Sequence, residues 1–331
     1  MSIIVQKYGG TSLREITNNK FLFHIRECIK KGNKLVIVVS AIGRKGDPYA
    51  TDTLIEQLEK INPKIDLKKK DLIMSCGEII SAATISHLLE TENIPCEVLT
   101  GYQAGILTDN NFTKSKILNI DTSIISKYIN QGKVVVVAGF QGKTINDEIT
   151  TLGRGGSDTT AVALGGYLNA ERVDIFTDVE GVAFVDPNLV KNTEYIKKIS
   201  YDDMYKLATN GVSVLHPRAV LLGKKYNTKI QVRSTYSEKM GTIVTNLDDQ
   251  QANKILGIAA KNENNKSIIS ILFNSEYRDI IIKEICDYLN EKNTKEQGNI
   301  KVICYEDKVS FIVEHTKLNY HINNLYNLFS N

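Results

Sequence analysis

The chain has 331 residues, of which 42% are hydrophobic, so it is long enough for two domains with sizeable cores. Its 41 Lys and Arg residues against 38 Asp and Glu leave a formal net charge of +3, and the basic residues are scattered, which argues against a nucleic-acid partner. Its five cysteines form no CxxC pair and no Cys/His cluster, so neither a disulfide framework nor a structural metal site is expected.

Short β-branched runs alternate with helical segments over residues 1–244. Apolar runs without strict alternation are typical of strands that are buried on both faces of a parallel sheet. The expected strands lie within residues 2–10, 34–43, 96–101, 133–142, 172–182 and 228–235. The expected helices lie within residues 17–32, 52–61, 77–93, 122–132 and 157–170. This alternation predicts an α/β sandwich.

The sequence changes character after residue 244. Residues 245–254 are polar and predict a linker. Residues 255–331 predict the order strand, strand, helix, strand, strand, helix, with a hairpin turn at "EDK" (306–308). We therefore expect a small α+β domain at the C-terminal end.

A glycine-rich loop follows the first expected strand. In "KYGGTS" the strand runs to Lys7, and Gly9, Gly10, Thr11 and Ser12 precede an expected helix. Glycines let the backbone approach an oxyanion, while free N–H groups, a helix dipole and a lysine attract negative charge. A tight strand-to-helix turn would give the same spacing, so the loop alone leaves both interpretations open.

The stretch "GFQGKT" resembles the end of a P-loop, but the position five residues before Gly142 is Val137 instead of the required glycine. The polar segment that follows is also unsuited to the required helix. We therefore reject a P-loop and expect Gly142 in a loop.

Charged residues recur at expected strand ends and helix starts. Glu78 follows Gly77 at the expected first turn of a helix, where alone it would be explained as a complement to the helix dipole. Thr177 and Asp178 end a strand, and open α/β sheets bind ligands at that end. With Lys7 and the Arg154 and Asp158 of "GRGGSD", these charges predict a functional site at one sheet edge.

Seven stretches in this order closely resemble the aspartate kinases of the amino-acid kinase superfamily: "KYGGTS", "VVSAIGRKGDPYATDTL", "SCGEIIS", "GFQG", "TLGRGGSD", "FTDVEGV" and "LHPRAV". The resemblance covers residues 1–244. It implies a three-layer α/β sandwich followed by a small ACT-like, ferredoxin-like domain. It also implies transfer of the ATP γ-phosphate to the β-carboxylate of L-aspartate, which gives 4-phospho-L-aspartate for lysine, threonine and methionine biosynthesis. The enzyme would be a cytoplasmic homodimer that pairs through the C-terminal domain, without nucleic-acid or membrane partners.

The resemblance also implies roles for individual residues. Lys7 would contact the transferred phosphate, and Asp158 would orient Lys7. ATP, with Mg²⁺ held through the nucleotide and no protein metal site, would bind at Lys7, Gly9, Gly10, Thr11, Ser12, Thr177, Asp178 and Asp186. Aspartate would bind at Ser40, Thr51, Glu78, Phe140, Arg154 and Gly155, with Arg154 on its α-carboxylate and Glu78 on its ammonium group. His216 would be structural.

The sequence departs from the family pattern in three places. Asn188 and Ser213 stand where family members commonly carry Arg and Lys near the ATP phosphates, and Arg218 or Lys191 would have to compensate. The chain has room for one ACT module instead of two, so whether lysine or threonine regulates it stays open. Two alternatives therefore stay open: a kinase for another amino-acid carboxylate, and a catalytically silent subunit.

Overall fold

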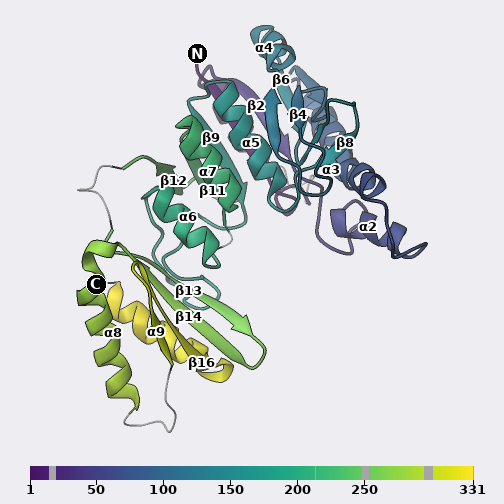
Figure 1. Cartoon of the computed structure of the whole chain (residues 1–331). Coiled ribbons are helices and arrows are strands. Elements are labelled where there is room, and N and C mark those ends of the chain that lie inside the picture. Colours follow the sequence, from purple (N-terminus) through teal and green to yellow (C-terminus); the bar gives the residue numbers. More distant parts are fainter. Residues whose placement is uncertain (15–19, 213, 248–252, 294–300, 331) are drawn as a thin grey trace.

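The computed structural model describes residues 1–14, 20–212, 214–247, 253–293 and 301–330 (Figure 1). Its main sheet has eight strands in the order β10-β12-β11-β9-β1-β2-β6-β3, and all neighbours are parallel except β11 and β12. The strands are β1 (Ile3–Tyr8), β2 (Lys34–Val39), β3 (Cys96–Leu99), β6 (Val134–Ala138), β9 (Arg172–Thr177), β10 (Lys198–Ser200), β11 (Ile230–Ser234) and β12 (Thr242–Thr245). All six strands that the sequence predicts are present.

Helices cover both faces of the main sheet, which explains why its strands are apolar without alternation. Val36 and Val38 of β2 pack with the helices of one face, whereas Leu35 and Ile37 pack with those of the other. The first face carries α4 (Ser123–Asn130), α5 (Gly156–Tyr167), α6 (Tyr201–Thr209) and α7 (Pro217–Tyr226). The second carries α1 (Lys20–Lys30) and α3 (Leu67–Thr91), with α2 (Thr51–Glu59) packed on α3. The predicted three-layer sandwich is confirmed.

A second, small sheet that the sequence analysis missed has the strand order β5-β4-β7-β8. Its strands are β4 (Ile106–Thr108), β5 (Ile117–Ile120), β7 (Gln141–Lys143) and β8 (Ile149–Thr151). Gly142 therefore lies in strand β7, and the expected loop at this position is wrong. The glycine allows close packing against the neighbouring strand, because a Cβ on Gly142 would lie 2.8 Å from the carbonyl oxygen of Ile106. The chain turns from β7 back into β8, and no P-loop helix follows.

Helix α3 is the central helix of the second face and begins ten residues before the predicted start at residue 77. Its cap is Asp66, whose side chain accepts a hydrogen bond from Lys69 N at 3.2 Å. Among the described residues, α3 is the one helix that is long and apolar enough to cross a membrane. Half of the residues in its most apolar segment are buried inside the protein. Asp71 on this helix is fully buried and accepts from the backbone N–H groups of Thr113 and Thr151, so α3 has the contacts of a core helix.

The C-terminal unit, residues 255–330, has the predicted order of elements. They are β13 (Ile255–Glu263), β14 (Lys266–Phe273), α8 (Arg278–Asn293), β15 (Val302–Cys304), β16 (Lys308–Glu314) and α9 (Leu318–Phe329). The sheet is antiparallel in the order β13-β14-β16-β15, and both helices pack on one face. If β13 is counted after α9, the order becomes the βαββαβ of a ferredoxin-like fold, which confirms the ACT-like prediction. The expected turn closes with a hydrogen bond from Tyr305 N to Lys308 O at 2.7 Å.

Residues 182–193, here called the shared loop, join this unit to the larger one. Val185 and Val190 are buried in the core of the C-terminal unit, and Ile258 N of β13 donates to Phe184 O at 2.8 Å. In the other direction, Leu256 of β13 belongs to the core of the main sheet. Figure 1 shows the C-terminal unit beside α6 and the edge of that sheet. Part of the expected linker 245–254 lies outside the described residues.

Candidate active site

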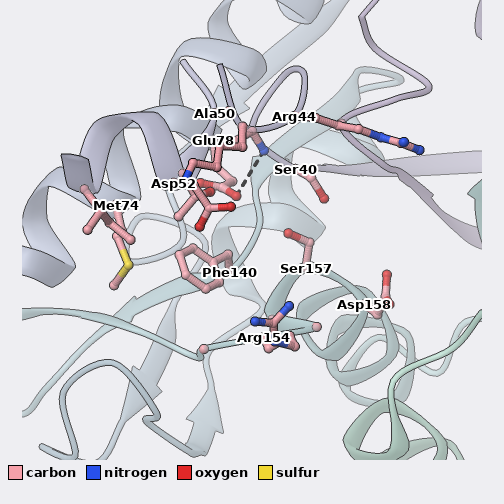
Figure 2. A pocket seen from close by; sticks show the side chains of 18 of the residues that line it. Ser40, Arg44, Ala50, Asp52, Met74, Glu78, Phe140, Arg154, Ser157 and Asp158 are labelled. Carbon is pink, nitrogen blue, oxygen red and sulfur yellow. Dashed lines mark hydrogen bonds between the residues drawn. The ribbon is translucent and has the colours of Figure 1, made fainter. Parts of the chain in front are cut away.

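A cavity of about 570 Å³ lies at the carboxyl ends of β1 and β2 and at the N-terminus of α5. Because β1 and β2 are parallel neighbours, the loops that follow them meet at one edge of the sheet. The cavity brings together most of the predicted site residues: Lys7, Gly10, Ser40, Thr51, Glu78, Phe140, Arg154, Gly155 and Asp158. Figure 2 shows Glu78 and Arg154 on opposite sides of this pocket.

The other predicted residues do not line this cavity: Gly9, Thr11, Ser12, Thr177, Asp178 and Asp186. Gly9 lies next to Lys7, since a Cβ there would be 3.5 Å from Lys7 Nζ. Thr177 is the last residue of β9, the other neighbour of β1, and Asp178 follows it. Asp186 is exposed in the shared loop, where its side chain accepts from Asn188 N at 2.8 Å and from Asn188 Nδ2 at 2.9 Å. The side-chain amide of Asn188 therefore makes its hydrogen bond within the shared loop.

A lysine and an aspartate form the centre of the site. Lys7 Nζ, at the end of β1, lies 2.7 Å from Asp158 Oδ1, in the first turn of α5. Both side chains are about nine-tenths shielded from solvent, with exposed fractions of 13% and 14%. The ion pair fixes the position of the Lys7 ammonium group in the cavity.

The glycine-rich loop after β1 is a turn in its described residues, since Leu13 N donates to Gly9 O at 3.2 Å. The expected start of the following helix lies outside the described residues, and α1 is described from Lys20 onward. Within the described part of the loop, anion binding would depend on backbone N–H groups and Lys7. Gly10 is required by close packing, because a Cβ there would lie 2.3 Å from Ala41 O.

Glu78 lies well inside α3, so the expected position at a helix start is wrong, and so is the dipole explanation. Gly77 belongs to the same helix, where a Cβ would come within 2.8 Å of Tyr49 O. Glu78 is 3% exposed; its Oε1 accepts from Ala41 N at 3.0 Å, whereas its Oε2 has no hydrogen-bond partner. Burial raises the pKa of Glu78 to about 8, against the opposing hydrogen bond from Ala41 and the charge of Lys7. An unpartnered buried carboxylate oxygen in a cavity suits a cationic ligand group.

The "GRGG" turn presents Arg154 to the cavity and is supported from behind by the start of α7. Gly155 has φ +68°, and a Cβ there would lie 2.2 Å from His216 Cγ. His216 is the N-cap of α7, since its Nδ1 accepts from Arg218 N at 3.3 Å, which fits a structural role. Arg218 donates to the carbonyl oxygen of Arg154 at 2.5 Å, so it supports the turn. Lys191 does not line the cavity, and Ser213 lies outside the described residues.

Phe140 forms the wall of the cavity in a conformation that sequence reasoning could not show. Its φ is +70°, in the left-handed region that bulky residues rarely adopt. The strain is held by two hydrogen bonds, from Phe140 N to Thr160 Oγ1 at 3.0 Å and from Leu152 N to Phe140 O at 2.8 Å. Strained residues of this kind concentrate at binding sites.

The cavity also contains polar residues that the sequence analysis did not assign: Arg44, Lys45, Asp52, Lys70, Lys114 and Ser157. The first three lie in the stretch "GRKGDPYATD", and Ser157 lies in "GRGGSD" itself, so the motifs contained a usable signal for these four. None of the motifs contains Lys70 or Lys114.

The sequence and the fold are similar to those of known proteins. The family described as "Amino acid kinase family" matches residues 2–234. Aspartokinase 1 of Bacillus subtilis is 46% identical over 74% of this chain and 61% of its own length, and an aspartokinase of Thermus thermophilus is 40% identical over 78% and 63%. The chain thus spans about three fifths of the length of these curated relatives.

Solved structures show the same fold. Aspartate kinase from Synechocystis is 32% identical and superposes with a TM-score of 0.66, covering 96% of this chain and 54% of its own. E. coli aspartokinase III in complex with aspartate and ADP has a TM-score of 0.76 at 19% identity, over 98% of this chain and 99% of its own. These findings confirm the resemblance to aspartate kinases, and the chain belongs to the amino acid kinase family.

Proposed function

We propose that the chain is an aspartate kinase that transfers the γ-phosphate of ATP to the β-carboxylate of L-aspartate, giving 4-phospho-L-aspartate. The observation that carries the proposal is the buried, unpartnered Oε2 of Glu78 across the cavity from Arg154, with the Lys7–Asp158 pair in the same cavity. An amino acid offers an ammonium group for Glu78 and an α-carboxylate for Arg154. Its side-chain carboxylate would then be directed toward Lys7.

The chemistry needs little beyond positioning and charge neutralisation. A carboxylate is already an anion, so it can attack a phosphorus atom without a strong general base. Lys7 would contact the transferred phosphoryl group, and Asp158, 2.7 Å from Lys7 Nζ, would fix the position of that ammonium group. Ser40, Thr51, Phe140 and Gly155 would complete the aspartate pocket.

The nucleotide would bind along the glycine-rich loop, with Gly9, Gly10, Thr11, Ser12, Thr177, Asp178 and Asp186 as its contacts. Mg²⁺ prefers oxygen ligands. Asp158 and Asp178 are each ion-paired with a basic side chain, and no group of three or more His, Cys, Asp or Glu side chains in the described part of the chain could hold a metal. Mg²⁺ would therefore bind chiefly to the phosphate oxygens of ATP, whose charge it would neutralise.

The purified chain tests the proposal directly. With ATP, Mg²⁺ and hydroxylamine, we expect aspartyl hydroxamate from L-aspartate at a higher kcat/KM than from glutamate or other amino-acid carboxylates. Faster reaction with another acid would support the alternative of a specialised carboxylate kinase. A folded chain that forms no hydroxamate with any acid would support the silent subunit and reject the proposal.

We further propose that the enzyme works as a homodimer in the cytoplasm, at the first step of lysine, threonine and methionine biosynthesis. The dimer proposal is supported by exposed apolar side chains on the C-terminal unit: Ile280, Ile303, Tyr320 and Leu328. Light scattering of the purified chain at micromolar concentration should give twice the mass of the 37.0 kDa monomer. A monomer under these conditions contradicts this part.

A further inference from the structure

The loop between β2 and α2, residues 40–50, is fixed against the glycine-rich loop at the mouth of the cavity. Gly43 N donates to Gly10 O at 3.1 Å, and Arg14 Nη2 lies 3.2 Å from Asp47 Oδ1. The other oxygen of Asp47 accepts from Arg44 N at 2.7 Å. The backbone of Arg44 is therefore held in place at this edge of the sheet.

The side chain of Arg44 crosses from one side of the glycine-rich loop to the other. Its Nη2 lies 3.0 Å from Asp178 Oδ2, directly after β9. The sheet order β9-β1-β2 places β1 between the two strands from which these residues come. The guanidinium group therefore passes over the carboxyl end of β1, where Lys7 and the glycine-rich loop are. Figure 2 shows Arg44 at the end of the pocket away from Met74.

The ion pair between Arg44 and Asp178 is easily exchanged. The two side chains are 67% and 47% exposed, and solvent-exposed pairs of this kind contribute little to stability. A polyphosphate offers a guanidinium group more charge and a bidentate geometry. Neither of the two residues named above as possible replacements for the missing cations is suited to this role, because Arg218 supports the "GRGG" turn and Lys191 does not line the cavity.

We infer that Arg44 binds the phosphates of the nucleotide, exchanging Asp178 for them when MgATP enters. This inference rests on the proposed function for the identity of the nucleotide, but it assigns a residue that the family motif does not. Arg44 would thereby replace a cation that family members commonly carry at the positions of Asn188 and Ser213.

The test is the affinity of the full chain for MgADP, measured by titration calorimetry, with steady-state kinetics beside it. We expect R44Q to weaken MgADP binding and raise the KM for ATP by about 10- to 100-fold, the loss expected for a charge-assisted hydrogen bond. The KM for aspartate should change less than about twofold, and R44K should recover part of the loss. R26Q is the matched control, because Arg26 is also exposed and paired with an acid, Glu92, but lies outside the cavity.

Each outcome decides the inference. An unchanged MgADP affinity in R44Q overturns it, even if the wild type phosphorylates aspartate. A higher KM for aspartate with an unchanged KM for ATP also overturns it, because Arg44 would then only hold the loop that leads into Thr51 at the start of α2. If R44Q weakens MgADP binding but the wild type phosphorylates a different acid, the role of Arg44 in nucleotide binding is supported. Aspartate is then rejected as the substrate.

Discussion

At the scale of single residues, Arg154 and Asp158 come from one motif but have different partners. We expect R154A to raise the KM for aspartate about 10- to 100-fold with a small change in kcat, because it removes a contact to the unreacting carboxylate. D158A should lower kcat by about 100-fold or more, since Lys7 then loses its 2.7 Å partner. Steady-state kinetics with aspartate and ATP varied separately measure both, and the reverse pattern would mean that the two roles are exchanged.

Glu78 gives a prediction that does not depend on the substrate. Its pKa of about 8 lies above its ordinary value of 4.5, so the folded state retains a proton that the unfolded state loses. The stabilisation by this proton is complete below pH 4.5 and is lost as the pH rises through about 8. The melting temperatures of the wild type and of E78Q should therefore depend differently on pH. Between pH 5.5 and 8.5 the melting temperature of the wild type should fall by a few degrees relative to that of E78Q. If the melting temperatures of the two proteins change in parallel with pH, the pKa of Glu78 is not raised in the folded state.

The same residue shows what the sequence could and could not tell. The motif "SCGEIIS" predicts Glu78 as a site residue, but the expected helix start at Gly77 is wrong, because Gly77 lies inside α3. The actual start of α3 had a local signal in Asp66, a preferred N-cap residue shortly after Pro63. Burial of one carboxylate oxygen without a partner depends on contacts between α3 and the loop after β2, which no local pattern encodes.

At the scale of elements, the contribution to stability of close packing between the "GRGG" turn and α7 can be measured separately from that of backbone strain. Gly132 is the control for Gly155, because its φ of +77° resembles the +68° of Gly155, but a Cβ on Gly132 would contact nothing within 4 Å. G132A should lose about 1 kcal/mol of unfolding free energy through strain alone. G155A should lose roughly 1–3 kcal/mol more through the collision with His216. Urea unfolding measures both, and equal losses would show that α7 gives way.

The elements that the sequence predicts well are those whose burial is uniform. Strands such as β2 and β6 are covered on both faces, so their apolar runs are continuous and easily recognised. The small sheet escaped prediction because three of its strands have only three residues, too few for a periodic pattern. Its position is set by long-range contacts, including those of the buried Asp71 with Thr113 and Thr151.

At the scale of the whole molecule, the two units should unfold together. Val190 comes from the larger unit but is buried in the core of the C-terminal unit. Leu256 comes from the C-terminal unit but is buried in the core of the main sheet. We expect a single transition in scanning calorimetry, and V190A should lower its midpoint without splitting it, at a cost of roughly 2 kcal/mol. Leu221→Ala, at a half-exposed position on α7, is the control and should leave the midpoint nearly unchanged. Two separate transitions in the wild type would mean that the cores are independent.

The shared loop also has a consequence for synthesis on the ribosome. Tyr326 of α9 donates to the carbonyl oxygen of Asn192, a contact that spans 134 residues of sequence. The main sheet can assemble as the chain emerges, but the loop beside the candidate nucleotide site reaches its final packing only after the last helix has left the exit tunnel. A ribosome-bound chain that stops short of α9 would therefore carry a nearly finished sheet with an unfinished loop.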